Sequence, residues 1–345
     1  MKLFEIINNS NNFLLFAMLF SSLSLVTCSK KTESQSGAIP GSDDVERVAA
    51  IKTQKQTGTA HRMVVDDCKR TVAVPVNPEK VVCLASADVE ILFAIGASGS
   101  LAGIPDGVIY PPSASSIRRI GGMYGRFNVE KIVGSTPDLV LMTISGWGQY
   151  RKHLDLLEKH NVTALGLHYP RSFDELISHI HRLGNIVNQP AAAASLADSM
   201  VQRRNAILEK TLPLDSSQRP RVYIEWVSSG GRGSTQGRKD RNHEIITIAG
   251  GNNIFADRED LSSFTASDEE VLSRNPQIII VTTDTTRNDP VKIKSMIRER
   301  AGWHQTDAVK YNHIYCIDAQ LTWANPRLIK GIEQCARIIH PELFK

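Results

Sequence analysis

The pattern of apolar and polar positions predicts a long helix at 190–212, near the middle of the chain. Pro190 suits the first position of a helix, and Pro213 blocks its continuation. Such a helix would be roughly 34 Å long, about the diameter of a small domain. The positions that recur at three- and four-residue steps are Ala197, Met200, Val201, Arg204, Leu208 and Leu212.

Two similar segments, 130–143 and 269–282, stand on either side of this helix. Each begins with a glutamate, reaches a proline seven residues later and ends in a continuous apolar run. The pattern predicts a short capped helix, a turn and a strand buried on both faces of a parallel sheet. The sequence therefore predicts an α/β fold with two lobes joined by the long helix.

Further strand and helix units support two lobes. We expect strands at 80–85 and 221–226, a helix from Ser86 to Ile95 with Ser86 as its cap, and a helix near 244–249. Two short strands, at 63–65 and 71–74, should precede the first unit.

The first residues have the pattern of an export signal. The apolar run 13–26 is short for a membrane span but typical of a signal peptide. It ends in Leu25-Val-Thr-Cys28, which resembles a bacterial lipoprotein cleavage box with Cys28 as the lipidated residue; an ordinary secreted protein is the alternative. The expected organisation is a signal peptide at 1–27, a lipid-anchored flexible tether at 28–56, an N-terminal lobe at 57–189, a spine helix at 190–212 and a C-terminal lobe at 213–345.

Composition and cysteine usage narrow the class of protein. The net charge of +4 is too mild to indicate a nucleic-acid partner. No CxxC pair is present, so zinc-ribbon and thioredoxin-like classes are excluded. Cys68, Cys83, Cys316 and Cys335 form an even set, which permits disulfides. Buried free thiols fit the apolar surroundings of Cys83 and Cys335 better, and a bridge between Cys316 and Cys335 stays open.

Aromatic residues gather at the predicted strand ends. Trp147, Trp226 and Trp323 each close or follow a predicted strand, whereas Trp303 is interpreted as structural. Ligands of open α/β sheets bind beyond these ends, so the tryptophans predict a flat, apolar ligand surface. The alternative is that they pack loops onto their own lobe. Other aromatics in such loops are Tyr110, Tyr124, Tyr150 and Phe264.

Basic residues lie near the same loops. The segment 230–241 carries Arg232, Arg238, Lys239 and Arg241, and Arg126 stands beside Tyr124. Such arginines suit carboxylates and other anions, although a solvated loop would also explain them. There is no GxGxxG, Walker or GxSxG motif, and no set of histidines at metal-ligand spacing. Tyr124 could ligate haem iron or only stack on a ligand.

Glu130 and Glu269 occupy equivalent positions in the two similar segments. Both fall in the first turn of a predicted helix, after Asn128 and Ser267 as caps, where the helix dipole favours a carboxylate. The functional alternative is a symmetric pair of exposed carboxylates that bind a two-fold partner. The residues alone leave both open.

Several motifs in order resemble one family. They are Pro78–Ala85, Glu90–Ala97, Gly121–Glu130, Pro137–Val140, Ala249–Asp257 and the ending His340–Phe344. From about residue 62 onward the chain resembles the substrate-binding proteins of ABC importers for ferric siderophores, haem and vitamin B12. The resemblance implies two Rossmann-like lobes on a single long helix, a ligand cleft between them, and delivery of the ligand to a permease dimer with its ATPase. It also implies that Glu130 and Glu269 pair with permease arginines.

The resemblance implies a binding protein rather than an enzyme, placed in the periplasm or cell envelope by a lipid anchor. A chelatase or reductase is the rival class, but no convergent catalytic set is present. We expect no permanent cofactor and a transported iron chelate, either a ferric siderophore or haem, with cobalamin as the alternative. The expected ligand-binding residues are Tyr124, Arg126, Trp147, Trp226, Arg232, Arg238, Phe264 and Trp323.

Overall fold

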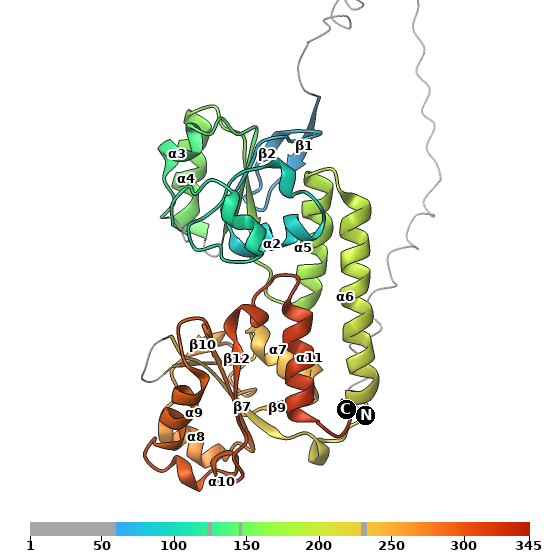
Figure 1. The fold of residues 1–345 in the computed structure, drawn as a ribbon. Coiled ribbons are helices and arrows are strands. Elements are labelled where there is room, and N and C mark those ends of the chain that lie inside the picture. Colours follow the sequence, from blue (N-terminus) through green and yellow to red (C-terminus); the bar gives the residue numbers. More distant parts are fainter. Residues whose placement is uncertain (1–59, 123–125, 145–146, 229–232) are drawn as a thin grey trace, which may run out of the picture. The chain divides into compact units, whose positions relative to one another are not determined.

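The computed structural model describes residues 60–122, 126–144, 147–228 and 233–345 (Figure 1). The predicted signal peptide, Cys28 and the whole predicted tether lie outside these residues. The chain divides into two units, 1–57 and 58–345, and the helices and strands given below belong to the second. Within it, 60–189 is called the N-terminal lobe and 213–345 the C-terminal lobe.

The N-terminal lobe is built on a parallel sheet. In the described residues this sheet has the order β4-β3-β5-β6, and an antiparallel hairpin of β1 and β2 precedes it. Every residue of β3 is buried, as is nearly all of β5, which agrees with the continuous apolar runs. The strands are β1 (His61–Val65), β2 (Thr71–Pro75), β3 (Val81–Cys83), β4 (Leu101–Gly103), β5 (Leu139–Ile144) and β6 (Ala164–His168). The helices are α2 (Ser86–Ala94), α3 (Val129–Val133), α4 (Trp147–Lys159) and α5 (Phe173–Ile186).

The prediction that Ser86 caps its helix is wrong. Ala85 is the N-cap, with an extended backbone, and no side chain accepts a hydrogen bond there. Ser86 is the first helical residue and faces the cavity described below.

The C-terminal lobe repeats the parallel core and adds antiparallel strands. In the described part of this lobe, β7, β11 and β12 run parallel, whereas β8 and β10 extend the β7 side antiparallel and β9 pairs with the start of β7. The strands are β7 (Arg221–Trp226), β8 (Ser234–Gln236), β9 (Asn252–Asn253), β10 (Ser263–Phe264), β11 (Ile278–Thr283) and β12 (Ile314–Asp318). The helices are α7 (Arg241–Ile248), α8 (Asp268–Arg274), α9 (Pro290–Arg298), α10 (Asp307–Lys310) and α11 (Leu328–Ile339). The repeated sequence segments are thus α3 with β5 and α8 with β11.

Helix α6 (Pro190–Thr211) joins the lobes with Pro190 in its first turn. It packs against α5 of the N-terminal lobe and against α7 and α11 of the C-terminal lobe (Figure 1). Its buried side chains are Ala193, Ala197, Met200, Ile207 and Thr211. The hydrophobic cluster to which Ala193 and Met200 belong contains residues of both sheets, so the lobes share one apolar core along α6.

Short turns connect α5 to α6, and a glycine permits their close approach. A Cβ atom on Gly184 would lie 2.3 Å from the Cβ of Ala193 and 3.0 Å from the carbonyl oxygen of Gln189. We therefore expect Gly184→Ala to lower the free energy of unfolding by about 1–3 kcal/mol, because overpacking outweighs the gain in helix propensity. Urea unfolding followed by circular dichroism measures the change.

The matched control is Gly99→Ala. A Cβ atom on Gly99 meets nothing within 4 Å. Its free energy of unfolding should stay within about 0.5 kcal/mol of the parent protein. Equal effects of the two substitutions would contradict the close packing of α5 and α6.

Candidate ligand cleft

A cavity of about 420 Å³ lies between the two lobes, at the carboxyl ends of the parallel strands. From the N-terminal lobe it is lined by Leu84, Ala85, Ser86, Ala87, Phe127, Met142, Thr143, Tyr150 and Tyr169. From the C-terminal lobe it is lined by Trp226, Ser234, Gln236, Asp240, Arg241, Asn242, Ser263, Thr282, Thr322 and Trp323.

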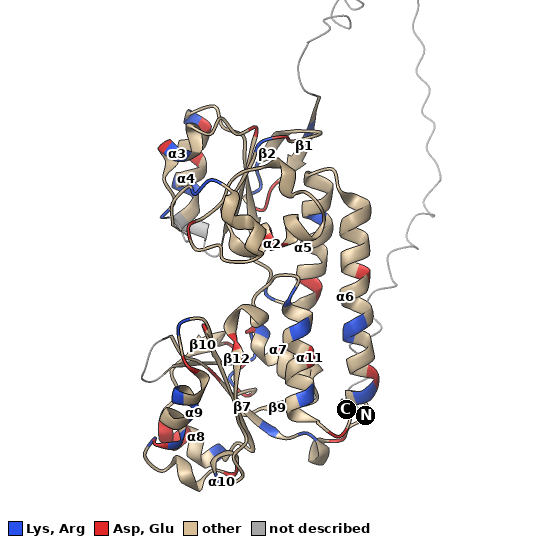
Figure 2. Cartoon of the chain, in the orientation of Figure 1, with Lys and Arg blue, Asp and Glu red and all other residues tan. Residues whose placement is uncertain are grey.

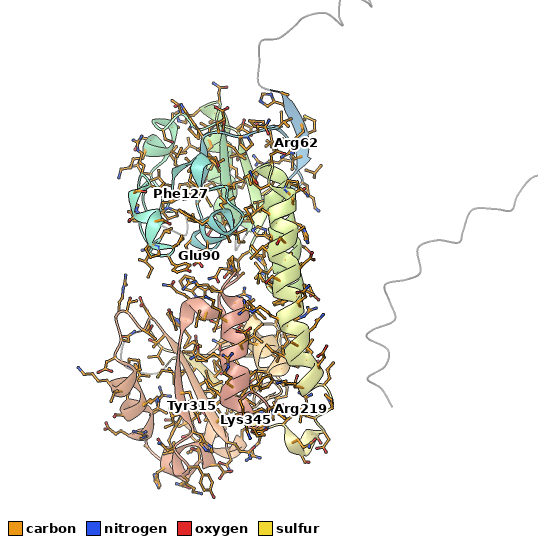
Figure 3. The ribbon with its side chains drawn as sticks, turned by 45° about the vertical axis from the view of Figure 1, so that its right-hand side comes forward. Arg62, Glu90, Phe127, Arg219, Tyr315 and Lys345 are labelled. Carbon is orange, nitrogen blue, oxygen red and sulfur yellow. The ribbon has the colours of Figure 1, made fainter. Side chains whose placement is uncertain are left out.

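The N-terminal wall is mainly apolar. Phe127 is 8% exposed and its ring lies 4.6 Å from that of His153, which holds it beside the cavity. Figure 3 labels Phe127 in this lobe. Tyr150 extends the wall from α4, and Tyr169 follows the end of β6. These rings offer a flat surface on which a planar ligand could stack.

The C-terminal wall combines two tryptophans with short polar side chains. Trp226, at the end of β7, is 43% exposed, which is unusual for so large an apolar side chain in a compact protein. Trp323 follows the short helical turn 319–322 and also lines the cavity. The exposed indole of Trp226 is therefore available to a ligand.

The predicted ligand-binding residues fall in different places. Trp226 and Trp323 line the cavity. Phe264 is instead partly buried against the core of its own lobe, where its ring and that of Phe255 form an edge-to-face pair with centroids 5.2 Å apart. Arg238 is exposed and donates to Glu259 at 2.6 Å, and Arg126 is exposed. Tyr124, Arg232 and the side chain of Trp147 lie outside what the structure describes.

Sequence reasoning missed several lining residues. Tyr169 directly follows β6, so the rule of aromatics at strand ends would have found it if 164–168 had been recognised as a strand. Gln236 and Ser234 alternate on β8, a three-residue strand whose sequence has no apolar alternation. Nothing in the sequence marked Phe127 as a lining residue except its position next to Arg126.

The charged residues among the described lining are Asp240 and Arg241, and both have partners. The guanidinium of Arg241 donates to the carbonyl oxygens of Thr322 at 2.9 Å and Pro170 at 2.6 Å. It also stands 5.1 Å from the ring centroid of Tyr169. The Asp240 carboxylate accepts from the backbone N–H of Asn242 at 2.9 Å, and burial raises its pKa. Arg241, the cation of this wall, therefore connects the two lobes.

Other polar contacts between the lobes flank the cavity. Arg327 of the C-terminal lobe binds both carboxylate oxygens of Glu90, at 2.7 and 2.8 Å, and lies over the ring of Tyr110 at 4.1 Å. Figure 3 places Glu90 at the end of its lobe that faces the other lobe. The Tyr169 hydroxyl accepts from the backbone N–H of Ala324 at 3.1 Å. These contacts fix the spacing of the two walls.

Glu244 makes a further contact between the lobes. Its carboxylate accepts from the backbone N–H of Phe173 at 2.8 Å, at the beginning of α5. Burial, as the largest influence, raises the pKa of Glu244 above its ordinary value, as it does for Glu90 despite the Arg327 guanidinium. Both contacts place partly desolvated carboxylates between the lobes.

Glu130 and Glu269 are exposed on α3 and α8, where Figure 2 shows acidic residues in each lobe. The predicted caps are present: Asn128 accepts from the backbone N–H of Lys131 at 2.8 Å, and Ser267 exchanges two hydrogen bonds with Glu270. Neither Glu130 nor Glu269 forms an ion pair within the described residues. Capping is therefore carried by their neighbours, and both carboxylates face solvent.

The four described cysteines are unpaired thiols, and Trp303 is buried in its lobe. Cys68, Cys83, Cys316 and Cys335 are free thiols, so the bridge between Cys316 and Cys335 that the sequence left open is not formed. Trp303 is 1% exposed and donates to Asp268 at 2.9 Å, which confirms its structural interpretation.

Among the described residues, no helix is long and apolar enough to cross a membrane.

The sequence pattern of one family, described as periplasmic binding protein, matches residues 81–321, more than half of the chain. The chain belongs to the periplasmic binding protein family. It is the substrate-binding component of an ABC importer rather than an enzyme, which confirms the family and the two-lobed α/β fold expected from the sequence.

Two relatives of this periplasmic binding protein match most of the chain. An uncharacterized ABC transporter substrate-binding lipoprotein of Bacillus subtilis, YvrC, is 29% identical over 84% of this chain and 90% of its own length. A cobalamin-binding protein of Halobacterium salinarum is 28% identical over 80% of this chain and 73% of its own.

Solved structures confirm the fold. The vitamin B12-binding protein BtuF of Vibrio cholerae has a TM-score of 0.63 at 24% identity, covering 77% of this chain and 98% of its own. The heme-binding protein RhuT of Roseiflexus sp. RS-1 has a TM-score of 0.66 at 20% identity, covering 76% and 98%.

The raised pKa of Glu244 predicts a pH-dependent contribution to stability. A carboxyl whose pKa is higher in the folded than in the unfolded chain stabilises the fold fully below its ordinary pKa of 4.5, and this contribution is lost as the pH rises through the folded value. We therefore compare the free energy of unfolding of the parent protein with that of Glu244→Gln. The parent value minus the variant value should fall as the pH rises from 4.5 to neutrality. Urea titrations at several pH values measure it.

Glu270→Gln is the control for this titration. The hydrogen bond from the Ser267 backbone lowers the pKa of Glu270, so its contribution changes only below the ordinary value of 4.5. Its difference from the parent should stay constant from pH 5 upward. A constant difference for Glu244→Gln over the same range would contradict the burial of that carboxyl.

Proposed function

We propose that this protein captures a corrinoid such as cobalamin between its lobes and delivers it to an ABC permease. The observation that carries the proposal is the chemistry of the cleft. Its described lining combines aromatic rings with hydroxyl and amide side chains, while the guanidinium of Arg241 already holds two carbonyl oxygens. A large, flat ligand with a neutral amide periphery suits such a lining better than a carboxylate-rich one.

The names of relatives support the same ligand class. Besides the cobalamin-binding protein of Halobacterium salinarum, a vitamin B12-binding protein of Yersinia pestis is 27% identical over 62% of this chain. The sequence favoured an iron chelate partly because of Arg238, but that side chain is exposed and paired with Glu259. The corrinoid is therefore placed ahead of the iron chelate.

Haem or a ferric siderophore is the second candidate. It is favoured by Tyr124 and the exposed Arg126, which would offer an iron ligand and a partner for an anionic group. In either case Trp226 and Trp323 would supply the contact surface, and Cys28 would carry the lipid anchor that keeps the protein in the cell envelope.

Absorbance titration and thermal shift of the full-length protein in detergent test the ligand. Cyanocobalamin at 100 times its Kd should raise the free energy of unfolding by about 2.7 kcal/mol. Trp226→Ala and Trp323→Ala should each weaken binding by about tenfold or more, because a stacked ring is lost. Tyr311→Ala is the control, since Tyr311 is 68% exposed but does not line the cleft.

A different result would favour the second candidate. Binding of haemin but not cyanocobalamin, lost in Tyr124→Phe, would exclude the corrinoid and assign Tyr124 to the iron.

We further propose that Glu130 and Glu269 dock the protein on a permease dimer together with its ATPase. Their exposure, one on each lobe, supports this role, because solvated carboxylates can pair with arginines of a two-fold partner. The double variant Glu130→Lys/Glu269→Lys should abolish uptake in cells while the ligand Kd of the purified protein stays unchanged.

Glu209→Lys provides the charge-reversal control. Glu209 is exposed on α6, away from both docking residues in sequence, and its reversal should leave uptake intact. Uptake that survives in the double variant would overturn the docking proposal without affecting the ligand assignment.

A further inference from the structure

One ion pair between the lobes is largely removed from water. The side chain of Glu90, on α2, is 5% exposed, and that of Arg327, directly before α11, is 13% exposed. The guanidinium of Arg327 binds both carboxylate oxygens, donates to Gln320 Oε1 at 2.7 Å and lies over the ring of Tyr110. Two opposite charges from different lobes are therefore held together in a poorly solvated place.

This pair lies next to the ligand cavity. Glu90 follows Ala87 by about one turn of α2, and Arg327 follows Trp323 by four residues; Ala87 and Trp323 both line the cavity. Figure 3 shows Glu90 at the end of its lobe that faces the other lobe. A separation of the lobes beside the cavity would therefore break the pair and return both charges to water.

The attraction within the pair is opposed by desolvation. Burial raises the pKa of Glu90, although the Arg327 guanidinium acts to lower it. Buried ion pairs of this kind contribute no more to stability than well-packed apolar side chains of similar size, because the charges lose their hydration. Removal of one partner is more severe, since it leaves the other charge buried and unpaired.

Two backbone N–H groups report whether the lobes are in contact. That of Phe173 stands at the first position of α5, where no carbonyl of the helix can accept it, and it donates to Glu244 of the other lobe. That of Ala324 donates to the Tyr169 hydroxyl of the other lobe at 3.1 Å. Both residues are fully buried. These two groups, called the reporter amides, should exchange hydrogen with solvent when the lobes separate.

We propose that Glu90 and Arg327 form a latch that holds the cleft closed and allows it to reopen. The charges attract each other when the lobes meet, and they regain their hydration when the lobes part, so the pair holds the lobes without locking them. This inference goes beyond the proposed function and does not depend on which ligand binds. Because the cavity lies between the lobes, the frequency of reopening limits how fast a ligand enters or leaves.

Hydrogen exchange of the ligand-free, full-length protein in detergent tests the latch. Mass spectrometry with fragmentation resolves single amides. In the parent protein, the reporter amides should exchange at least about tenfold faster than the amides of β5 and β11, because the lobes separate without unfolding of the sheets.

Single and double substitutions should act in opposite directions. Arg327→Met and Glu90→Met each leave one buried charge unpaired, so each should speed exchange at least about tenfold at the reporter amide of the lobe that is not substituted. That amide is Phe173 for Arg327→Met and Ala324 for Glu90→Met. The double variant Glu90→Met/Arg327→Met should slow exchange of both reporter amides below the parent rate, because apolar side chains favour the closed contact.

Arg274→Met is the matched control. Arg274 binds both carboxylate oxygens of Asp257, donates to the carbonyl oxygen of Ile254 and lies over the ring of Phe255 at 4.7 Å. It thus makes the same kinds of contact as the arginine of the latch, but within the C-terminal lobe. Its substitution should leave the exchange of both reporter amides unchanged relative to β5 and β11.

Faster exchange in the single variants and slower exchange in the double variant would support the latch. Reporter amides that exchange at the rate of β5 and β11 in the parent protein would overturn it, because the lobes then separate only on unfolding. Unchanged reporter amides in the single variants, or equal acceleration of the core strands, would also overturn it. So would faster exchange in the double variant, which would show that the pair is a net attraction rather than a balanced contact.

Discussion

The burial of α6 against both lobes is the interaction on which the rest of the structure depends. Small side chains such as Ala193 and Ala197 let α5 and α6 approach closely, and one apolar cluster then runs from the N-terminal sheet to the C-terminal sheet. Because interiors are close-packed, a core shared in this way transmits the position of one lobe to the other. The width of the cleft is set by that core and by the polar contacts between the lobes beside it.

Those polar contacts also decide the electrostatic character of the cleft. Arg241 donates hydrogen bonds to carbonyl oxygens of both lobes, and Arg327 is paired with Glu90. Arginine, which in a sequence suggests anion binding, here connects the two lobes. Aromatic rings together with hydroxyl and amide side chains remain as groups that can contact a ligand.

Much of the fold was predictable because burial leaves a direct trace in the sequence. Strands such as β5 and β11, covered on both faces, are continuous apolar runs, and the prolines before them mark the turns. The site was predictable where it follows a topological rule, as for Trp226 and Trp323 at strand ends. Arg238 could not be placed, because its partner Glu259 lies 21 residues away and nothing local identifies it. Whether the Gln236 side-chain oxygen has a partner depends on its neighbours in space, which composition and periodicity do not report.

The Glu90–Arg327 pair joins residues 237 positions apart in the chain. Such a contact cannot form until nearly the whole polypeptide is available, since it needs α2 of the first lobe and the start of α11 in the second. An N-terminal lobe that folded first would hold the Glu90 carboxylate without the guanidinium of Arg327. Completion of the cleft is therefore a late event in folding, and a chain cut after α6 would lack the counterion of Glu90.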